Sequence, residues 1–355
     1  TNRLHSFINK RIKFIMAFTT INKSGDYFNT KLYTGNGGTQ SITGVGFQPD
    51  FTWLKGRSFA DYHVVNDAVR GATKSIYPND TSSEGTQTNG LTSFDSDGFS
   101  IGNWSNINPN GGTLASWNWK ANGAGSANTD GSINSTVSVN TTAGFSIATF
   151  TTLNSTISTV GHGLGVVPDM YIVKTRANSN GWFVYHKDIG NTKFLRLETT
   201  GAETANAMWN NTSPTSDVFT INANNFGAST SVAYCFNDVQ GYSKFGSYVG
   251  NGNVDGTFVY TGFKPAWLLR KRTDQGAAST WLIHDSKRGV NTNAVRLRAE
   301  LPDAESSGNE VDLLSNGFKI RETGGYGNAS GSPYIYMAFA SAPLVGSNNV
   351  PCTAR

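Results

Sequence analysis

The chain contains little cysteine and little charge. Its two cysteines, Cys235 and Cys352, are too few for a disulfide framework. Charged residues make up 15% of the 355 residues, against about 25% in an average soluble domain. The net charge of +4 gives no basic stripe of the kind that nucleic-acid binding requires. No apolar run is long enough to cross a bilayer. We therefore expect no nucleic-acid partner and no membrane insertion.

The sequence also lacks a sustained helical period. It has 40 glycines, and Asn, Ser and Thr take the place of the Lys and Glu of helical proteins. These residues favour turns, and Thr favours strands. The 12% of aromatic residues supply enough apolar surface for cores. This composition predicts an all-β protein.

The first residues have a different composition from the rest. The segment from Asn2 to Ile15 is basic and apolar, but it has no small-residue cleavage site of the kind a signal peptide needs. Met16 is typical of an initiator. We expect residues 1–15 to be a translated leader, with a short docking arm as the alternative, and we assign residues 1–30 to this leader or arm.

Internal repeats organise the remainder of the chain. Three prolines are each followed by large apolar residues two and four places later and by a lysine six places later. This alternation predicts a strand. The three segments are Pro49–Lys55, Pro168–Lys174 and Pro265–Lys271.

Other landmarks recur in the same order around these strands. A Phe-x-Ile segment appears at Phe99, Phe219 and Phe318, twice after the hairpin signals Asp97-Gly98 and Asn316-Gly317. Each copy spans about 100 residues and about seven short strands, which is typical of a β-sandwich or jelly roll. We predict three tandem, diverged β-sandwich units with short linkers rich in Gly, Asn and Ser. The boundaries are 31–121, 122–239 with a linker hairpin at its start, and 240–343, followed by a tail at 344–355.

The apolar residues of the three post-proline strands are expected to point into cores. They are Phe51 and Trp53, Met170 and Ile172, and Trp267 and Leu269. The lysines that end these strands, Lys55, Lys174 and Lys271, share the parity of the inward positions. We expect them to extend to solvent or to pair with an acid.

With these landmarks the chain resembles a family of virion structural proteins of marine bacteriophages, of the tail-fibre type. The segments that carry the resemblance are 33–40, 46–50, 69–74, 160–165, 241–248 and 353–355. The resemblance covers the chain from about Lys31 to its end. It implies a place in a virus particle and other virion proteins as partners, and it brings no catalytic residues.

Candidate catalytic groups are few. His186 and His284 are placed at equivalent positions, where the first copy has Asn66, and a general base or metal ligand would not be replaced by Asn. The five histidines show no zinc spacing, so no metal and no cofactor is expected. Cys235 is expected to be a buried free thiol. An acidic pair brought together from distant strands would escape this reasoning.

Aromatic residues on polar loops are the candidate ligand contacts. After each Phe-x-Ile strand, a loop rich in Gly, Asn and Ser carries one ring, and we place these rings at one loop position. They are Trp104, Phe226 and Tyr326, with Trp209 as a weaker candidate. Such rings can stack on sugars. The alternative is that each ring covers the edge of its own sandwich.

These observations favour a non-enzymatic virion structural protein, in a tail fibre or a surface decoration, that contacts host-surface glycans. A homo-oligomer is expected by analogy with fibre proteins. A soluble carbohydrate-binding module or lectin is the alternative, and a polysaccharide-degrading enzyme comes third.

Overall fold

The computed structural model describes residues 19–343 apart from Ser155, Asn225, 277–278, Val290, 292–293 and Asn309. In this described part the helices are two single turns, η1 (Ser24–Asp26) and η2 (Ala207–Trp209), and strands form the rest of the regular structure. The prediction of an all-β fold is confirmed. The expected leader at 1–15 and the tail at 344–355, which contains Cys352, lie outside the described residues.

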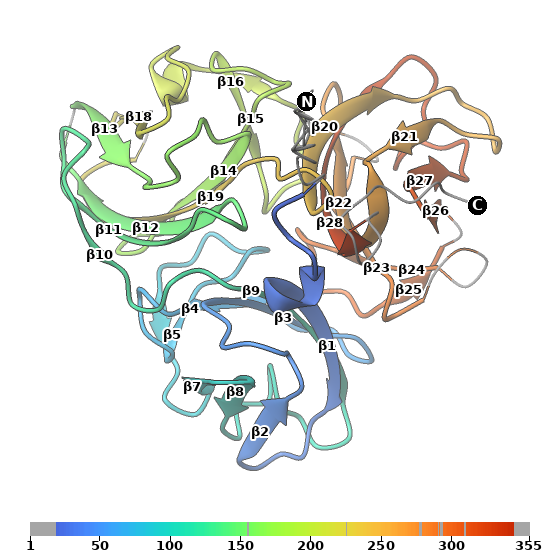
Figure 1. Cartoon of the computed structure of the whole chain (residues 1–355), viewed down its shortest axis with the longest axis horizontal. Helices are drawn as coiled ribbons and strands as arrows, with labels where there is room; N and C mark the ends of the chain where they lie inside the picture. The colour runs from blue at the N-terminus through green and yellow to red at the C-terminus, as the bar shows by residue number, and fades with distance from the viewer. Residues whose placement is uncertain are drawn as a thin grey trace, which may run out of the picture.

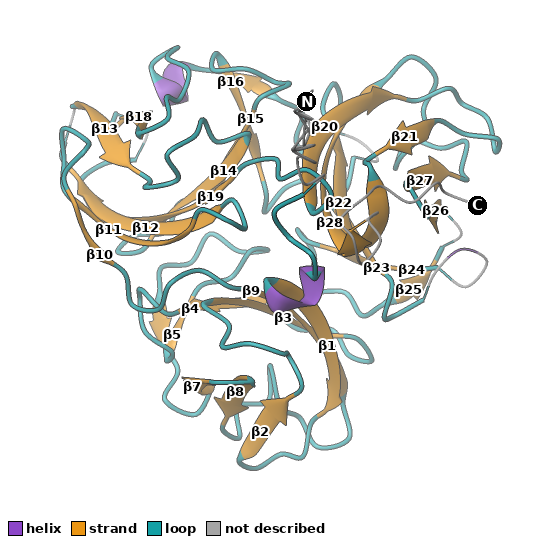
Figure 2. Ribbon diagram, viewed as in Figure 1, coloured by secondary structure: helices purple, strands orange, loops and turns teal. Residues whose placement is uncertain are grey.

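Three lobes surround a common centre in the view down the shortest axis of the molecule (Figure 1). In each lobe a large antiparallel sheet lies toward the centre and a small sheet lies further out (Figure 2). Each lobe is therefore a sandwich whose large sheet has one face turned to the other two lobes.

The first lobe has a large sheet of order β1-β9-β3-β4, a small sheet of order β2-β8-β7 and a β5-β6 ribbon. The strands are β1 (Phe28–Thr34), β2 (Gln40–Thr43), β3 (Phe51–Gly56), β4 (Val64–Asp67), β5 (Lys74–Ser75), β6 (Gly85–Thr86), β7 (Leu91–Asp95), β8 (Gly98–Ile101) and β9 (Thr113–Trp119).

The second lobe has a large sheet of order β10-β11-β12-β19-β14-β15-β16-β17 and a small sheet of β13 and β18. The strands are β10 (Ser126–Asn128), β11 (Ser135–Asn140), β12 (Phe145–Thr152), β13 (Ile157–Gly161), β14 (Met170–Thr175), β15 (Trp182–His186), β16 (Lys193–Arg196), β17 (Thr204–Ala205), β18 (Val218–Asn222) and β19 (Ser229–Phe236).

The third lobe has a large sheet of order β20-β28-β22-β23-β24-β25 and a small sheet of order β21-β27-β26. The strands are β20 (Ser243–Val249), β21 (Phe258–Tyr260), β22 (Phe263–Arg272), β23 (Leu282–Asp285), β24 (Val295–Arg298), β25 (Ser306–Ser307), β26 (Val311–Leu314), β27 (Gly317–Ile320) and β28 (Pro333–Pro343).

The post-proline strands β3, β14 and β22 occupy the same place in their lobes. Each pairs on one side with the last strand of its lobe, so that Phe51 opposes Trp119, Met170 opposes Phe236, and Trp267 opposes Phe339. This common register defines which residues of the three lobes correspond.

The residues predicted to point into cores are buried, each with at most 5% of its surface exposed. The core that they fill is not the interior of a single sandwich. Phe51, Met170 and Trp267 belong to one apolar cluster contributed by all three lobes, which we call the central cluster. The opposite face of the same strands fills the interior of each lobe, with Leu54 in the first and Leu268 in the third. Both faces of these strands are buried because the lobes pack against one another.

Candidate functional site

Two of the four rings predicted to stack on sugars are buried in the second lobe. Phe226 and Trp209 have no exposed surface, and their ring centroids lie 6.4 Å apart. Trp209 Nε1 donates to the carbonyl of Lys193 at 3.0 Å. The small sheet here has only two strands, and these loop rings complete the interior that it leaves uncovered. The predicted glycan contact is therefore wrong for Phe226 and Trp209.

The other two rings are half-buried and do not occupy one loop position. Asn108 N donates to the carbonyl of Trp104, and Asn328 N donates to the carbonyl of Gly324. Trp104 therefore corresponds to Gly324 and not to Tyr326, so the predicted set of equivalent rings is not formed. The guanidinium groups of Arg296 and Arg298 lie 5.4 and 5.9 Å from the ring centroid of Tyr326, which occupies its face with cations.

Trp104 belongs to a small aromatic patch on the first lobe. Its ring lies 6.4 Å from that of Tyr77, which lies 5.5 Å from the ring of Tyr62. Tyr62 is 44% exposed. Beside the patch, Asn106 Nδ2 donates to Asp61 Oδ1 at 2.8 Å. Trp104 itself is half-buried and packs against the core of the first lobe.

The histidines do not form a shared site. His186 opposes Met170, whereas Asp285 opposes Trp267, so His186 corresponds to Asp285. His284 lies one residue earlier, on the opposite face of its strand. The predicted equivalence of His186 and His284 is wrong, because a slip of one residue turns a side chain to the other face.

A buried ionic cluster lies inside the third lobe. Arg270 binds Glu322 at 3.2 Å, and His284 Nε2 lies 3.3 Å from Glu310, which also contacts Arg296. Burial and the nearby Arg270 hold the pKa of His284 well below its usual range, so the imidazole is neutral. None of these five side chains is more than 17% exposed. Because these side chains are buried, the cluster is closed to a polymeric substrate.

The three lysines make the same type of contact between lobes. Each Nζ donates to the carbonyl of the next residue and to a carbonyl of another lobe. Lys55 reaches Pro302 at 2.9 Å, Lys174 reaches Thr81 at 3.1 Å, and Lys271 reaches Thr200 at 3.1 Å. The acid pairing or solvent exposure expected from the sequence is wrong, because the neighbouring lobe covers each strand end. Burial lowers the pKa of Lys55 and Lys174 to about 8 and that of Lys271 to about 7.

A second type of hydrogen bond, donated by a ring N–H, also recurs at the three contacts between lobes, which we call the joints. Trp182 Nε1 donates to the carbonyl of Tyr77 at 2.8 Å, and Trp281 Nε1 donates to that of Arg196 at 2.9 Å. At the joint between the third and first lobes, His63 takes the place of tryptophan. Its Nε2 lies 2.9 Å from the carbonyl of Arg298, while its Nδ1 accepts from Trp53 Nε1. The first lobe thus contacts the third, the second contacts the first, and the third contacts the second, which closes a ring of three.

Two of the joints add a buried ionic network. At the joint of the first and second lobes, Asp67 binds Arg70 at 2.5 Å and accepts from Tyr234 Oη at 2.7 Å, while Glu84 binds both Arg70 and Arg176. The joint of the third and first lobes repeats this arrangement. Its members are Asp285, Arg288, Trp117, Glu305 and Arg57.

The joint of the second and third lobes replaces this network. His186 stands at the aspartate position, Ile189 at the first arginine position and Thr273 at the second. Burial lowers the pKa of His186 to about 4, so its imidazole is neutral at pH 7. These three residues replace one aspartate and two arginines with side chains that carry no charge at pH 7. The buried ionic network is therefore present at two of the three joints.

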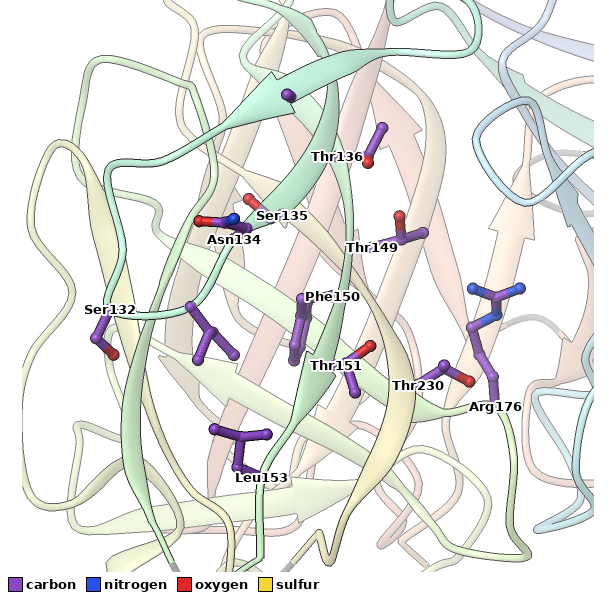
Figure 3. A pocket seen from close by; sticks show the side chains of 12 residues that line it. Ser132, Asn134, Ser135, Thr136, Thr149, Phe150, Thr151, Leu153, Arg176 and Thr230 are labelled. Carbon is purple, nitrogen blue, oxygen red and sulfur yellow. The ribbon is translucent and has the colours of Figure 1, made fainter.

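A surface groove lies on the large sheet of the second lobe, and we call it the threonine groove. It has a volume of about 640 Å³. Its lining is shown in Figure 3 and consists of Ala127, Ser132, Ile133, Asn134, Ser135, Thr136, Thr149, Phe150, Thr151, Leu153, Arg176 and Thr230. Thr136 opposes Thr149 and Thr151 opposes Thr230 across neighbouring strands. The hydroxyls therefore lie in pairs along one face.

The β10–β11 hairpin builds one wall of this groove. In the described residues the other two lobes have no counterpart of these strands, because their large sheets begin at β1 and β20. Ser132 and Thr159 exchange two hydrogen bonds of 2.8 Å through their side chains and backbones. A Cβ on Gly131 would lie 2.3 Å from the carbonyl oxygen of Thr159, so only glycine allows this close approach. The linker hairpin expected at the start of this unit corresponds to β11 and β12, whereas β10 and the groove were not predicted.

The chemistry of the threonine groove is that of neutral hydrogen bonding. Its ionisable side chain, Arg176, binds Glu84 at 2.8 and 2.9 Å, which offsets its charge. Leu153, which is 54% exposed, adds apolar surface, whereas Phe150 is buried in the interior of the lobe. In the described part of the chain, no three or more His, Cys, Asp or Glu side chains gather as a metal site. Cys235 is a free thiol, and burial raises its pKa. The groove can bind a polyhydroxylated ligand through hydroxyl and amide contacts.

Comparison with known proteins gives a family and no relative of known activity. No helix of the described residues is long and apolar enough to span a membrane. Neither the curated proteins nor the solved structures contain a match to the chain. One family model matches residues 23–343, which include all three lobes, and is described as a domain of unknown function, DUF7483. The chain therefore belongs to the DUF7483 family, whose match extends over the whole ring of lobes and not over one sandwich.

Proposed function

We propose that this protein is a non-enzymatic structural protein of a virus particle, in a tail fibre or a surface decoration, that contacts host-surface glycans. One observation carries the proposal: the same lysine contact joins all three pairs of lobes. Ionic networks reinforce two of the joints. Polar groups placed in this way contribute to a fixed shape, which suits a building block. The resemblance to phage virion proteins supports the same reading.

The threonine groove supports the glycan part of this proposal. Its paired hydroxyls and Asn134 offer donors and acceptors to sugar hydroxyls, and Leu153, which is 54% exposed, offers apolar surface to the C–H face of a sugar. A groove open to solvent admits one stretch of a long polysaccharide. Each contact is weak, and several copies on one particle would raise the avidity.

The decisive experiment is mass spectrometry of purified virus particles. We expect the chain to be present in them at a copy number set by the symmetry of the particle. Its absence from purified particles, together with its presence in the host secretome, would contradict the virion role.

A soluble carbohydrate-binding module is the second candidate, and the threonine groove is the observation that favours it. The two candidates share glycan binding but differ in location. Binding of host glycans by free protein that never enters particles would select the second. Release of reducing ends from host polysaccharide would instead point to an enzyme, and we expect none.

A further inference from the structure

The outer strand of the small sheet in the third lobe carries two exposed aromatic rings. Phe258 is 45% exposed and Tyr260 is 60% exposed, while Val259 between them is buried. In Figure 1 this strand, β21, lies on the outside of its lobe. It pairs with β27 alone and forms the edge of the sheet. Edge strands with large apolar side chains risk aggregation, and proteins usually place small or polar residues there.

The other two lobes have small or polar residues at the corresponding positions. Val259 opposes Phe318, as Ile42 opposes Phe99 and Val160 opposes Phe219. The inward residue is therefore aliphatic in all three lobes. The outward pair is Ser41 and Thr43 in the first lobe and Thr159 and Gly161 in the second. Only the third lobe places rings where its counterparts have hydroxyls or no side chain, so the sandwich itself does not require them.

The backbone holds these rings in a fixed position. Val259 packs into the interior of the third lobe. A Cβ on Gly317 would lie 2.0 Å from the carbonyl oxygen of Val259, so β27 and β21 approach as closely as glycine permits. At the end of the strand, the ring of Tyr260 lies over Gly262, where a Cβ would be 3.6–3.8 Å from the ring and its hydroxyl.

A polar pocket of about 450 Å³ lies beside Tyr260. Asp238, Gln240, Lys244 and Thr261 contribute to its lining. Both oxygens of Asp238 are occupied, since Oδ2 binds Lys187 and Lys244 and Oδ1 accepts from the backbone of Phe245. Thr261 Oγ1 donates to the carbonyl of Phe263.

The groups of this pocket that remain available to a ligand are neutral or cationic. Gln240 is exposed, and its amide provides both a donor and an acceptor. The remaining protons of the Lys244 ammonium and the hydroxyl of Tyr260 add donors. An exposed ring next to such groups matches a sugar, which has an apolar C–H face and a rim of hydroxyls.

We propose that the Phe258–Tyr260 face and the adjacent pocket form a second carbohydrate-binding site, separate from the threonine groove. Tyr260 stacks on the C–H face of a sugar ring, and Gln240 and Lys244 bind its hydroxyls or a carboxylate on it. Phe258, two residues away on the same face, contacts the next sugar of the chain. This inference rests on the proposed glycan-binding function and adds a second binding site to it.

The test uses the full-length protein on an immobilised panel of neutral and uronic-acid oligosaccharides. The variant carries Phe258→Ser and Tyr260→Thr, the residues that the first lobe has at these positions, so it suits the same strand. We expect binding to at least one oligosaccharide to weaken about tenfold or more, as loss of ring stacking usually does. Tyr260→Phe should keep most of the binding. Gln240→Ala, outside any core, should weaken it without a change in thermal stability.

The outcomes separate this site from the proposed function. If the wild type binds no oligosaccharide, glycan binding fails for both sites. If the wild type binds and the double variant binds equally well, this site is wrong and the proposed function stands. Loss of binding in Thr151→Val with Thr230→Val, and in no other variant, would likewise assign all binding to the threonine groove. Equal losses of binding in Tyr260→Phe and in the double variant would overturn the stacking contact.

Discussion

At the scale of single residues, burial decides what the ionisable side chains do. Lys55, Lys174 and Lys271 are fully buried and each bonds to two carbonyl oxygens instead of a carboxylate. Carbonyl oxygens stabilise an ammonium less than a carboxylate would, so burial dominates and lowers the pKa. The joints are therefore strongest when these lysines lose their proton.

This property predicts that stability rises with pH. Between pH 7 and 10 the unfolded chain keeps a proton on residue 271, whereas the folded lysine, with a pKa of about 7, has lost it. The unfolded state binds more protons, so the free energy of unfolding increases with pH. Lys271→Met should lower this slope by up to about 1.4 kcal/mol per pH unit. Urea unfolding at pH 7, 8 and 9 measures it.

Lys264→Met is the matched control, because Lys264 is exposed and lies on the same strand, β22. Its slope should equal that of the wild type. A Lys271→Met protein with an unchanged slope would show that this lysine stays charged in the fold.

The aspartate–arginine pairs can be tested with residues taken from the second lobe. Asp285→His leaves the buried Arg288 without its nearest carboxylate and should cost about 3 kcal/mol or more. Adding Arg288→Ile restores the combination that the second lobe has at His186 and Ile189. The double variant should be less destabilised than the sum of the single variants. Additive losses in a double-mutant cycle would show that the pair is not coupled.

At the scale of elements, the hairpins explain two glycines. The Asp97-Gly98 and Asn316-Gly317 signals do mark hairpins, and in each hairpin the glycine is the first residue of its strand, preceded by a two-residue loop. A third strand imposes the glycine. A Cβ on Gly98 would lie 1.9 Å from the carbonyl oxygen of Ile42 in β2, and one on Gly317 would meet Val259 in β21.

Gly98→Ala should therefore separate β2 from β8. The backbone of Ile42 cannot move away without breaking the ladder, and Gly98 has a φ of +152° that other residues rarely adopt. We expect a loss of about 2–4 kcal/mol in the free energy of unfolding. Gly25→Ala, which has open space around it, should change stability by less than about 0.5 kcal/mol. Similar unfolding midpoints for both variants would contradict the close approach.

At the scale of the whole molecule, the central cluster makes the three sandwiches one structure. The ring of Trp267 lies 5.5 Å from that of Trp119, 6.2 Å from that of Trp117 and 6.5 Å from that of Trp53. All three partners belong to the first lobe, which is not joined to the third by consecutive residues. Apolar packing therefore joins what the chain leaves apart.

Trp267→Ala should destabilise all three lobes and not the third lobe alone. We expect a cost of about 3–5 kcal/mol, as for other buried tryptophans. Intrinsic fluorescence and amide exchange of strands in each lobe should report one shared transition. Loss of protection confined to the third lobe would show that the lobes unfold separately.

The sequence by itself determined the strands, their order and the buried apolar residues. Alternation with a period of two and repeated landmarks are local properties, so the post-proline strands and the β7–β8 hairpin followed from them. Only the tertiary structure decided which core each face enters. Both faces of β3, β14 and β22 carry large apolar side chains, and nothing in one strand indicates that three lobes meet.

The same limit applies to the candidate sites. Phe226 and Tyr260 are both aromatic residues near polar neighbours, yet one fills a core and the other is 60% exposed. The two rings differ because the small sheet covers less of the second lobe than of the third. The size of each small sheet depends on pairing between strands that are distant in the sequence. The threonine groove needs β10, β11, β12 and β19 side by side. The composition of a loop indicates that a ring can bind a ligand, but long-range packing decides whether that ring reaches the surface.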